Sequence, residues 1–210
     1  MKVEDVTPVI PEGGLSALDK VALSPGHQRM LDAAAAACSG PRWWRTRKWA
    51  EARDLLALSQ IAPRFRVLDL DMRETLRVRA AMRVTVPCRP GADGQLRIEH
   101  LAVLGIMYSQ EAVFRPQPGY TFVIILEPKG IWHPNVAVTP AQVVCLGPQL
   151  QPGVLAKELV HLAYGALTFQ SVQMSEYDFA GVMNADAARW WQQHRELIPL
   201  SRTPFLCPGD

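Results

Sequence analysis

The residue types that could do covalent chemistry are Cys145 and two histidines, His133 and His161, in the second half of the chain. A cysteine thiolate is a strong nucleophile, and a histidine within hydrogen-bond reach of it could serve as the base of a cysteine hydrolase. Taken alone, however, Val143-Val144-Cys145-Leu146 is typical of a core strand, since unpaired cysteine is among the most buried residue types. A lone histidine is also more often structural than catalytic.

The other cysteines, Cys38, Cys88 and Cys207, form no Cys-x-x-Cys pair and show no regular spacing with Cys145. That pattern argues against a zinc site and against a disulfide framework. We therefore expect no metal, and we interpret these three cysteines as incidental. The sequence implies no small cofactor either.

An alternation of apolar and polar residues from Leu76 to Val86 predicts a half-buried strand, since successive side chains of a strand point to opposite faces. Residues 87–94 carry the turn chemistry of a hairpin, with Pro90-Gly91 and Asp93-Gly94, and residues 96–106 supply the returning strand. Further strands are expected at 65–70 and 120–126. The prediction is an antiparallel meander of three or four strands.

Helices are expected on both sides of this meander, at 27–38, 45–59, 154–169 and 185–196. Ser24-Pro25 suits the start of the first helix, and Trp49 and three leucines would form the apolar face of the second. Helix, meander, irregular loop and two helices make an α+β order.

Composition restricts the partners. The formal charge of +2 comes from 22 basic and 20 acidic residues that are mixed along the chain, so we expect no nucleic acid. No apolar run approaches the roughly 20 residues that a membrane-spanning helix needs, so we expect no membrane insertion. The early acidic residues do not fit a secretory signal, which favours a cytoplasmic protein.

Ile131-Trp132-His133-Pro134-Asn135-Val136 is followed by Val143-Val144-Cys145-Leu146-Gly147. This arrangement resembles the ubiquitin-conjugating enzymes, which have a His-Pro-Asn tripeptide and then their catalytic cysteine. Phe114-Arg115-Pro116-Gln117-Pro118 is similar to the family's Phe-x-Pro-Pro segment, and Asn184-Ala185-Asp186-Ala187-Ala188 to the start of a later family helix. Asn135 precedes Cys145 by 10 positions, a longer loop than is usual in eukaryotic members.

The resemblance implies a UBC-like fold and a role for each site residue. Cys145 would carry a ubiquitin-like protein as a thioester, and the Asn135 amide would stabilise the oxyanion, an effect worth roughly 3 kcal/mol in oxyanion holes. Asp178, the nearest match to the family's acidic residue, or Glu176 would help the attacking amine to lose its proton. His133 and Pro134 would shape the loop. We expect residues 41–200 to form this domain, with 1–40 a helical extension and 201–210 a tail.

The implied partners are a ubiquitin-like protein, a separate ATP-dependent activating enzyme and a target protein. Some bacterial operons associated with antiphage defence encode such sets, and the divergence of this chain resembles them. In the family the first helix docks activating enzymes and ligases, so the basic run Arg42, Arg45, Arg47 and Lys48 is either a solvated face or a docking surface. Two other functions stay open: a catalytically silent scaffold that binds ubiquitin-like proteins, and a hydrolase using Cys145 with His133 or His161.

Overall fold

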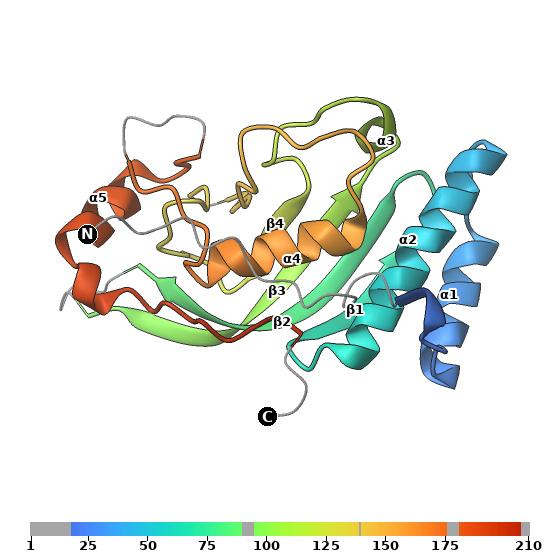
Figure 1. Cartoon of the computed structure of the whole chain (residues 1–210), viewed down its shortest axis with the longest axis horizontal. Helices are drawn as coiled ribbons and strands as arrows, with labels where there is room; N and C mark the ends of the chain where they lie inside the picture. The colour runs from blue at the N-terminus through green and yellow to red at the C-terminus, as the bar shows by residue number, and fades with distance from the viewer. Residues whose placement is uncertain (1–17, 90–94, 139, 176–180, 207–210) are drawn as a thin grey trace.

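The computed structural model describes residues 18–89, 95–138, 140–175 and 181–206. Its centre is one four-stranded antiparallel sheet in the order β1-β2-β3-β4 (Figure 1). The strands are β1 (Phe65–Asp71), β2 (Leu76–Cys88), β3 (Arg97–Tyr108) and β4 (Val123–Glu127). The predicted α+β class and the antiparallel meander are therefore confirmed.

The alternation in β2 has the expected consequence. Leu76, Val78 and Met82 are buried in the core, whereas Arg77 and Arg79 on the opposite face are exposed. Burial of alternate apolar side chains fixes the register of a strand, because a one-residue slip would turn all of them toward water. The long pairing of β2 with β3 thus forms the central part of the sheet. The predicted turn residues Pro90-Gly91 and Asp93-Gly94 lie outside the described residues.

The helices are α1 (Pro25–Ala36), α2 (Arg42–Ile61), the short α3 (Glu111–Phe114), α4 (Ala156–Leu167) and α5 (Ala185–Gln193). In Figure 1, α4 crosses one face of the sheet, α1 and α2 lie at one end, and α5 lies at the other. Two 3-10 turns add to these, Leu18–Lys20 and Arg195–Leu197. Contacts of α2 with β1 and α4, and of α4 with β2, enclose the core.

Helix starts follow their caps. The Ser24 side chain accepts a hydrogen bond from the His27 amide at the start of α1, and the Asn184 side chain accepts one from the Ala187 amide at the start of α5. Such bonds satisfy backbone donors that have no partner inside the helix. The α2 helix is longer than predicted, since Pro41 is its N-cap residue and Arg42 its first residue.

Two predictions about α2 were wrong. Trp49 is 44% exposed and does not belong to the apolar face, which is made by Leu55, Leu56 and Leu58. Lys48 is fully buried and is not part of a solvated basic face. Four backbone carbonyl oxygens lie within 3.4 Å of its Nζ and share its three N–H donors, and these hydrogen bonds replace the water that a buried ammonium loses.

The predicted helical extension packs on the rest of the fold, with α1 in contact with α2 and β1. Residues 1–17 and 207–210 lie outside the described part, so the domain boundaries at 40 and 200 stay predictions. Within the described ranges, every helix is too short or too polar to cross a membrane.

Candidate functional site

The segment with His133 and the segment with Cys145 pair as a short antiparallel ladder. The Cys145 amide donates to the Asn135 carbonyl over 2.8 Å, and the Ala137 amide donates to the Val143 carbonyl over 2.9 Å. Val136 and Val144 form the bridge between these two hydrogen bonds. The ladder therefore sets Asn135 directly opposite Cys145, although 10 positions separate them in the sequence.

The two faces of this ladder differ in composition. Val136 and Val144 are completely buried in the main core. Because directly opposite residues of a ladder project to the same face and successive residues alternate, Asn135 and Cys145 share the face away from that bridge. The tertiary structure thus brings the amide and the thiol of the two predicted catalytic residues to one side.

A hydrogen bond to its side chain fixes the orientation of Asn135. It is 6% exposed, and its Oδ1 accepts a hydrogen bond of 3.2 Å from the Gln173 backbone amide. With the oxygen of the amide committed in this way, its Nδ2 is the donor that remains for a bound group. The geometry suits a fixed hydrogen-bond donor.

The loop is tied to the start of α5 through Pro134. The Pro134 carbonyl accepts hydrogen bonds from the amides of Met183 and Asn184, at 2.8 and 3.0 Å. The Trp191 indole of α5 also donates to the Trp132 carbonyl over 2.8 Å. These three hydrogen bonds therefore fix Trp132 and Pro134, the residues on either side of His133.

His133 is completely buried and packs against the Phe169 ring, with ring centroids 4.2 Å apart. Its Nδ1 accepts a hydrogen bond from the Asn135 amide over 3.1 Å. Burial lowers the pKa of His133 to about 3, and the Ala166 backbone opposes this shift only in part. The imidazole is therefore neutral at physiological pH and braces the turn that carries Asn135.

Cys145 is 2% exposed, and its Sγ lies 3.5 Å from the Gly147 carbonyl oxygen. The chain turns sharply after it, since Gly147 has a φ of +126°, a region that favours glycine. Gly119 packs against this turn, and its carbonyl accepts a hydrogen bond from the Leu146 amide. Backbone contacts thus define the position of the sulfur.

Gln142 is a site-supporting residue that the sequence prediction missed. Its buried side chain accepts hydrogen bonds from the amides of Gly130 and Ile131 and donates to the carbonyls of Ile125 and Pro128. Its backbone has a φ of +44°, which few side chains other than asparagine and aspartate adopt readily. Gln142 therefore joins the segment before Cys145 to the end of β4 and to the loop that leads to His133, through partners 11 to 17 positions earlier in the sequence.

The other predicted residues fall in different places. Asp178 lies outside the described residues, as do Glu176, Tyr177 and Cys207. His161 lies on α4 against Phe205, and neither of its ring nitrogens makes a hydrogen bond to a described residue. Burial also lowers its pKa.

The described cysteines, Cys38, Cys88 and Cys145, form no disulfide with one another. Cys38 lies just beyond α1, and Cys88 is buried at the end of β2. Within the described ranges, no cluster of three or more histidine, cysteine or acidic side chains is arranged to hold a metal ion.

No protein-family model matches the chain, and searches of curated proteins and of solved structures found no protein that matches it.

Proposed function

We propose that this protein is a conjugating enzyme that accepts a ubiquitin-like protein from an activating enzyme as a thioester on Cys145 and transfers it to an amine. The observation that carries the proposal is the hydrogen bond from the Cys145 amide to the Asn135 carbonyl. In this pairing Cys145, the proposed nucleophile, lies opposite Asn135, the proposed amide donor and the last residue of the His-Pro-Asn tripeptide.

The reaction would proceed in two acyl transfers. In the first, the Cys145 thiolate attacks the carbonyl carbon of the incoming thioester and forms a new carbon–sulfur bond. The carbon–sulfur bond to the activating enzyme breaks, and its cysteine leaves as a thiolate. In the second, an acceptor amine attacks the new thioester, loses its proton and expels the Cys145 thiolate. The Nδ2 of Asn135 would stabilise the oxyanion of that second step, and Asp178 is the proposed acceptor of the proton.

The 2% exposure of Cys145 adds a requirement to this proposal. A protein-sized thioester can reach the sulfur only if the chain around it opens, and the turn at Gly147 is the adjacent segment in which the Sγ contact is made. Docking of a partner would supply the free energy for this opening.

A hydrolase with a cysteine–histidine pair has less support. The Nδ1 of His133 accepts from the Asn135 amide, and its Nε2 makes no hydrogen bond to a described residue. His161 likewise makes no bond to Cys145. A general base works within hydrogen-bond reach of its nucleophile, and the hydrogen bonds of the described residues pair neither histidine with Cys145.

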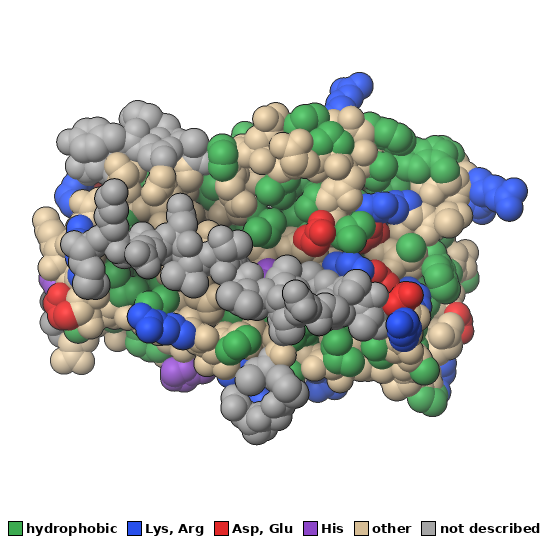
Figure 2. Space-filling view, viewed as in Figure 1, with side chains coloured by type: hydrophobic (Ala, Val, Ile, Leu, Met, Phe, Trp, Pro, Cys, Tyr) green, Lys and Arg blue, Asp and Glu red, His purple; other side chains and the backbone are tan. Residues whose placement is uncertain are grey.

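The proposed surface for the activating enzyme is an aromatic patch made by Trp43 of α2 and Phe114 of α3. Their rings meet edge to face with centroids 4.9 Å apart, and they are 41% and 63% exposed. Figure 2 shows apolar side chains gathered around α3 on this face. Exposed aromatic side chains are frequent anchors of protein interfaces. A docking role for the patch also suits the silent-scaffold alternative, which the Cys145 experiment separates.

The experiment is a charging assay with the full chain, a candidate activating enzyme, a ubiquitin-like protein and ATP-magnesium. We expect wild-type protein to form an adduct that a reducing agent removes, and Cys145→Ser to form a more stable ester or none. Cys88→Ser is the matched control, since Cys88 is also a buried thiol, and it should charge normally. An adduct that persists in Cys145→Ala, or a charged activating enzyme that never transfers to wild type, would overturn the proposal.

A further inference from the structure

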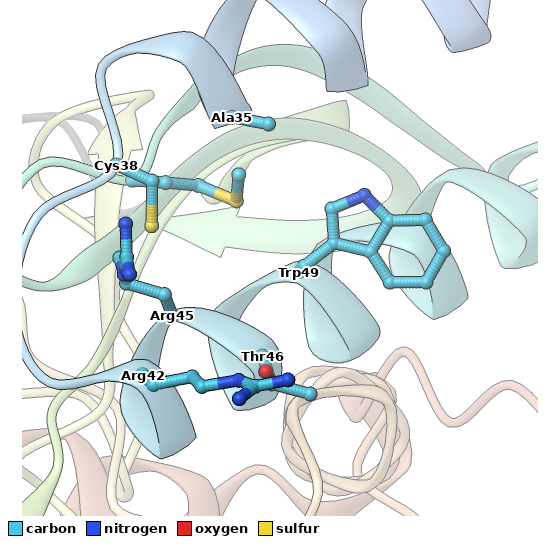
Figure 3. Close-up of a pocket in the computed structure, with 7 residues that line it drawn as sticks. Ala35, Cys38, Arg42, Arg45, Thr46 and Trp49 are labelled. Atoms are coloured by element: carbon cyan, nitrogen blue, oxygen red, sulfur yellow. The ribbon is translucent and has the colours of Figure 1, made fainter.

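A cavity of about 310 Å³ lies between α1 and α2, at the end of the molecule away from α5 (Figures 1 and 3). One face of α2 lines it with Arg42, Arg45, Thr46 and Trp49, whose spacing of three and four residues stacks them along the helix. Figure 3 shows Arg45 and Trp49 on opposite sides of the hollow, with Arg42 and Thr46 along its lower edge. The cavity therefore has a cationic part and an aromatic part.

The two arginines are not used by the fold. Within the described residues, Arg42 and Arg45 make no side-chain hydrogen bond and no ion pair. The next arginines of the same helix behave differently: Arg47 binds Glu51 at 2.7 Å, and Arg53 donates to the backbone carbonyls of the first 3-10 turn. Thus α2 directs two guanidinium groups into a cavity without a carboxylate from the described chain to neutralise them.

Nearby charges do not cancel the positive potential that Arg42 and Arg45 create in the cavity. Asp71 precedes Met72, which lines the cavity, but its carboxylate is bound by Arg73 at 2.8 Å. The first residue of α2 and the last turn of α1 border the cavity together, and the partial charges at these two helix ends are of opposite sign and roughly half a unit each. The two full charges of Arg42 and Arg45 therefore set the local potential.

Part of the lining is apolar. Ala35 of α1, the buried Met72 and the Trp49 indole contribute to it. A flat ring could stack on the indole while its anionic group binds the guanidinium groups, whose planar forks suit phosphate and carboxylate oxygens. The volume is at the lower end of the range for small-molecule sites.

We propose that this cavity binds a small aromatic anion, in which a phosphate or carboxylate group pairs with Arg42 and Arg45 and a ring stacks on Trp49. This site is separate from Cys145 and does not depend on the proposed conjugating activity. The Thr46 hydroxyl, on the same helix face, supplies a further donor to the anion.

The test is a titration of the full chain followed through the Trp49 indole N–H signal in a nitrogen–proton NMR spectrum. The signal is assigned by its loss in Trp49→Phe. Adenosine 5′-monophosphate and isophthalate are the phosphate and carboxylate probes, and adenosine and inorganic phosphate each lack one half of the ligand. We expect at least one aromatic anion to shift the signal saturably, and both half-ligands to bind about tenfold more weakly or less.

Variants identify the groups that bind. Arg42→Gln and Arg45→Gln should each weaken binding about tenfold, because each removes a charge-assisted hydrogen bond. Arg66→Gln is the matched control, since Arg66 is an exposed arginine of β1, and it should leave the affinity unchanged. Equal losses in Arg45→Gln and Arg66→Gln, or no saturable shift with either aromatic anion, would overturn the proposal.

Discussion

Gly119 lies against Gly147 so closely that the fold has no room for a side chain between them. A Cβ atom built on Gly119 would overlap the Gly147 carbonyl oxygen and lie 2.8 Å from the Gly147 amide nitrogen. The same carbonyl oxygen is the one near the Cys145 sulfur. Gly119 therefore supports the turn that positions the candidate nucleophile, from a segment 26 positions earlier in the sequence.

Gly119→Ala should displace the Gly147 turn. The obstacle is backbone and cannot rotate away, so we expect a loss of about 1–3 kcal/mol in the free energy of unfolding, together with slower charging of Cys145. Urea unfolding and the charging assay measure the two effects. Gly26→Ala is the control, because a Cβ there meets nothing within 4 Å and alanine favours a helix. Equal stability of Gly119→Ala and wild type would contradict the close approach.

Asn135→Ala should separate the two transfers. It removes the proposed oxyanion donor, so we expect transfer to an amine to slow by about 10²–10³-fold while the thioester still forms. Asn135→Asp keeps an oxygen to accept from Gln173 but lacks the N–H donors, and it should fail in transfer as well. Single-turnover discharge of preformed thioester measures this rate. Normal discharge by Asn135→Asp would show that Asn135 serves only to hold the loop.

Acid should destabilise the fold through His133. Its folded pKa is about 3, below the unfolded value of about 6.5, so the unfolded chain binds one more proton between these limits and stability falls as the pH falls. The loss attributable to this group is roughly 2 kcal/mol at pH 5. His161 acts in the same direction.

Urea unfolding at pH 7 and pH 5 measures the His133 contribution. His133→Gln starts less stable because the packing on Phe169 changes, but its difference between the two pH values should shrink by roughly 2 kcal/mol. His100→Gln is the control, since His100 is exposed on β3 and should leave the difference unchanged. An undiminished difference in His133→Gln would show that the imidazole is accessible to protons in the folded state.

Lys48→Met should destabilise the end of the molecule formed by α1 and α2. The Lys48 Nζ bonds the carbonyls of Ser39, Met72, Arg73 and Glu74, at 2.5 to 3.4 Å, so the variant leaves buried acceptors without a donor. We expect a loss of about 2–4 kcal/mol in the free energy of unfolding. Arg45→Met, at an exposed position of the same helix, should change it by less than about 0.5 kcal/mol. Similar values for the two variants would contradict the role of Lys48 as the donor to these four carbonyls.

The sequence by itself determined the elements, because their signals are local. The period of two from Leu76 to Val86 requires only that alternate side chains face the core, and the Ser24 and Asn184 caps act within three residues. The meander and all four long helices were therefore predictable to within a few residues. Local patterns also identified Cys145 and Asn135 as candidates, since both lie in one recognisable motif.

Only the tertiary structure decided how the site is held and which polar groups are buried. Lys48 looked like part of a basic surface because the carbonyls that bind it come from segments 9 to 26 positions away. Gln142 has no local signal for its role, since its four partners belong to the end of β4 and the loop that follows. Hydrogen bonds between distant segments depend on how the chain folds back on itself, which local periodicity does not encode.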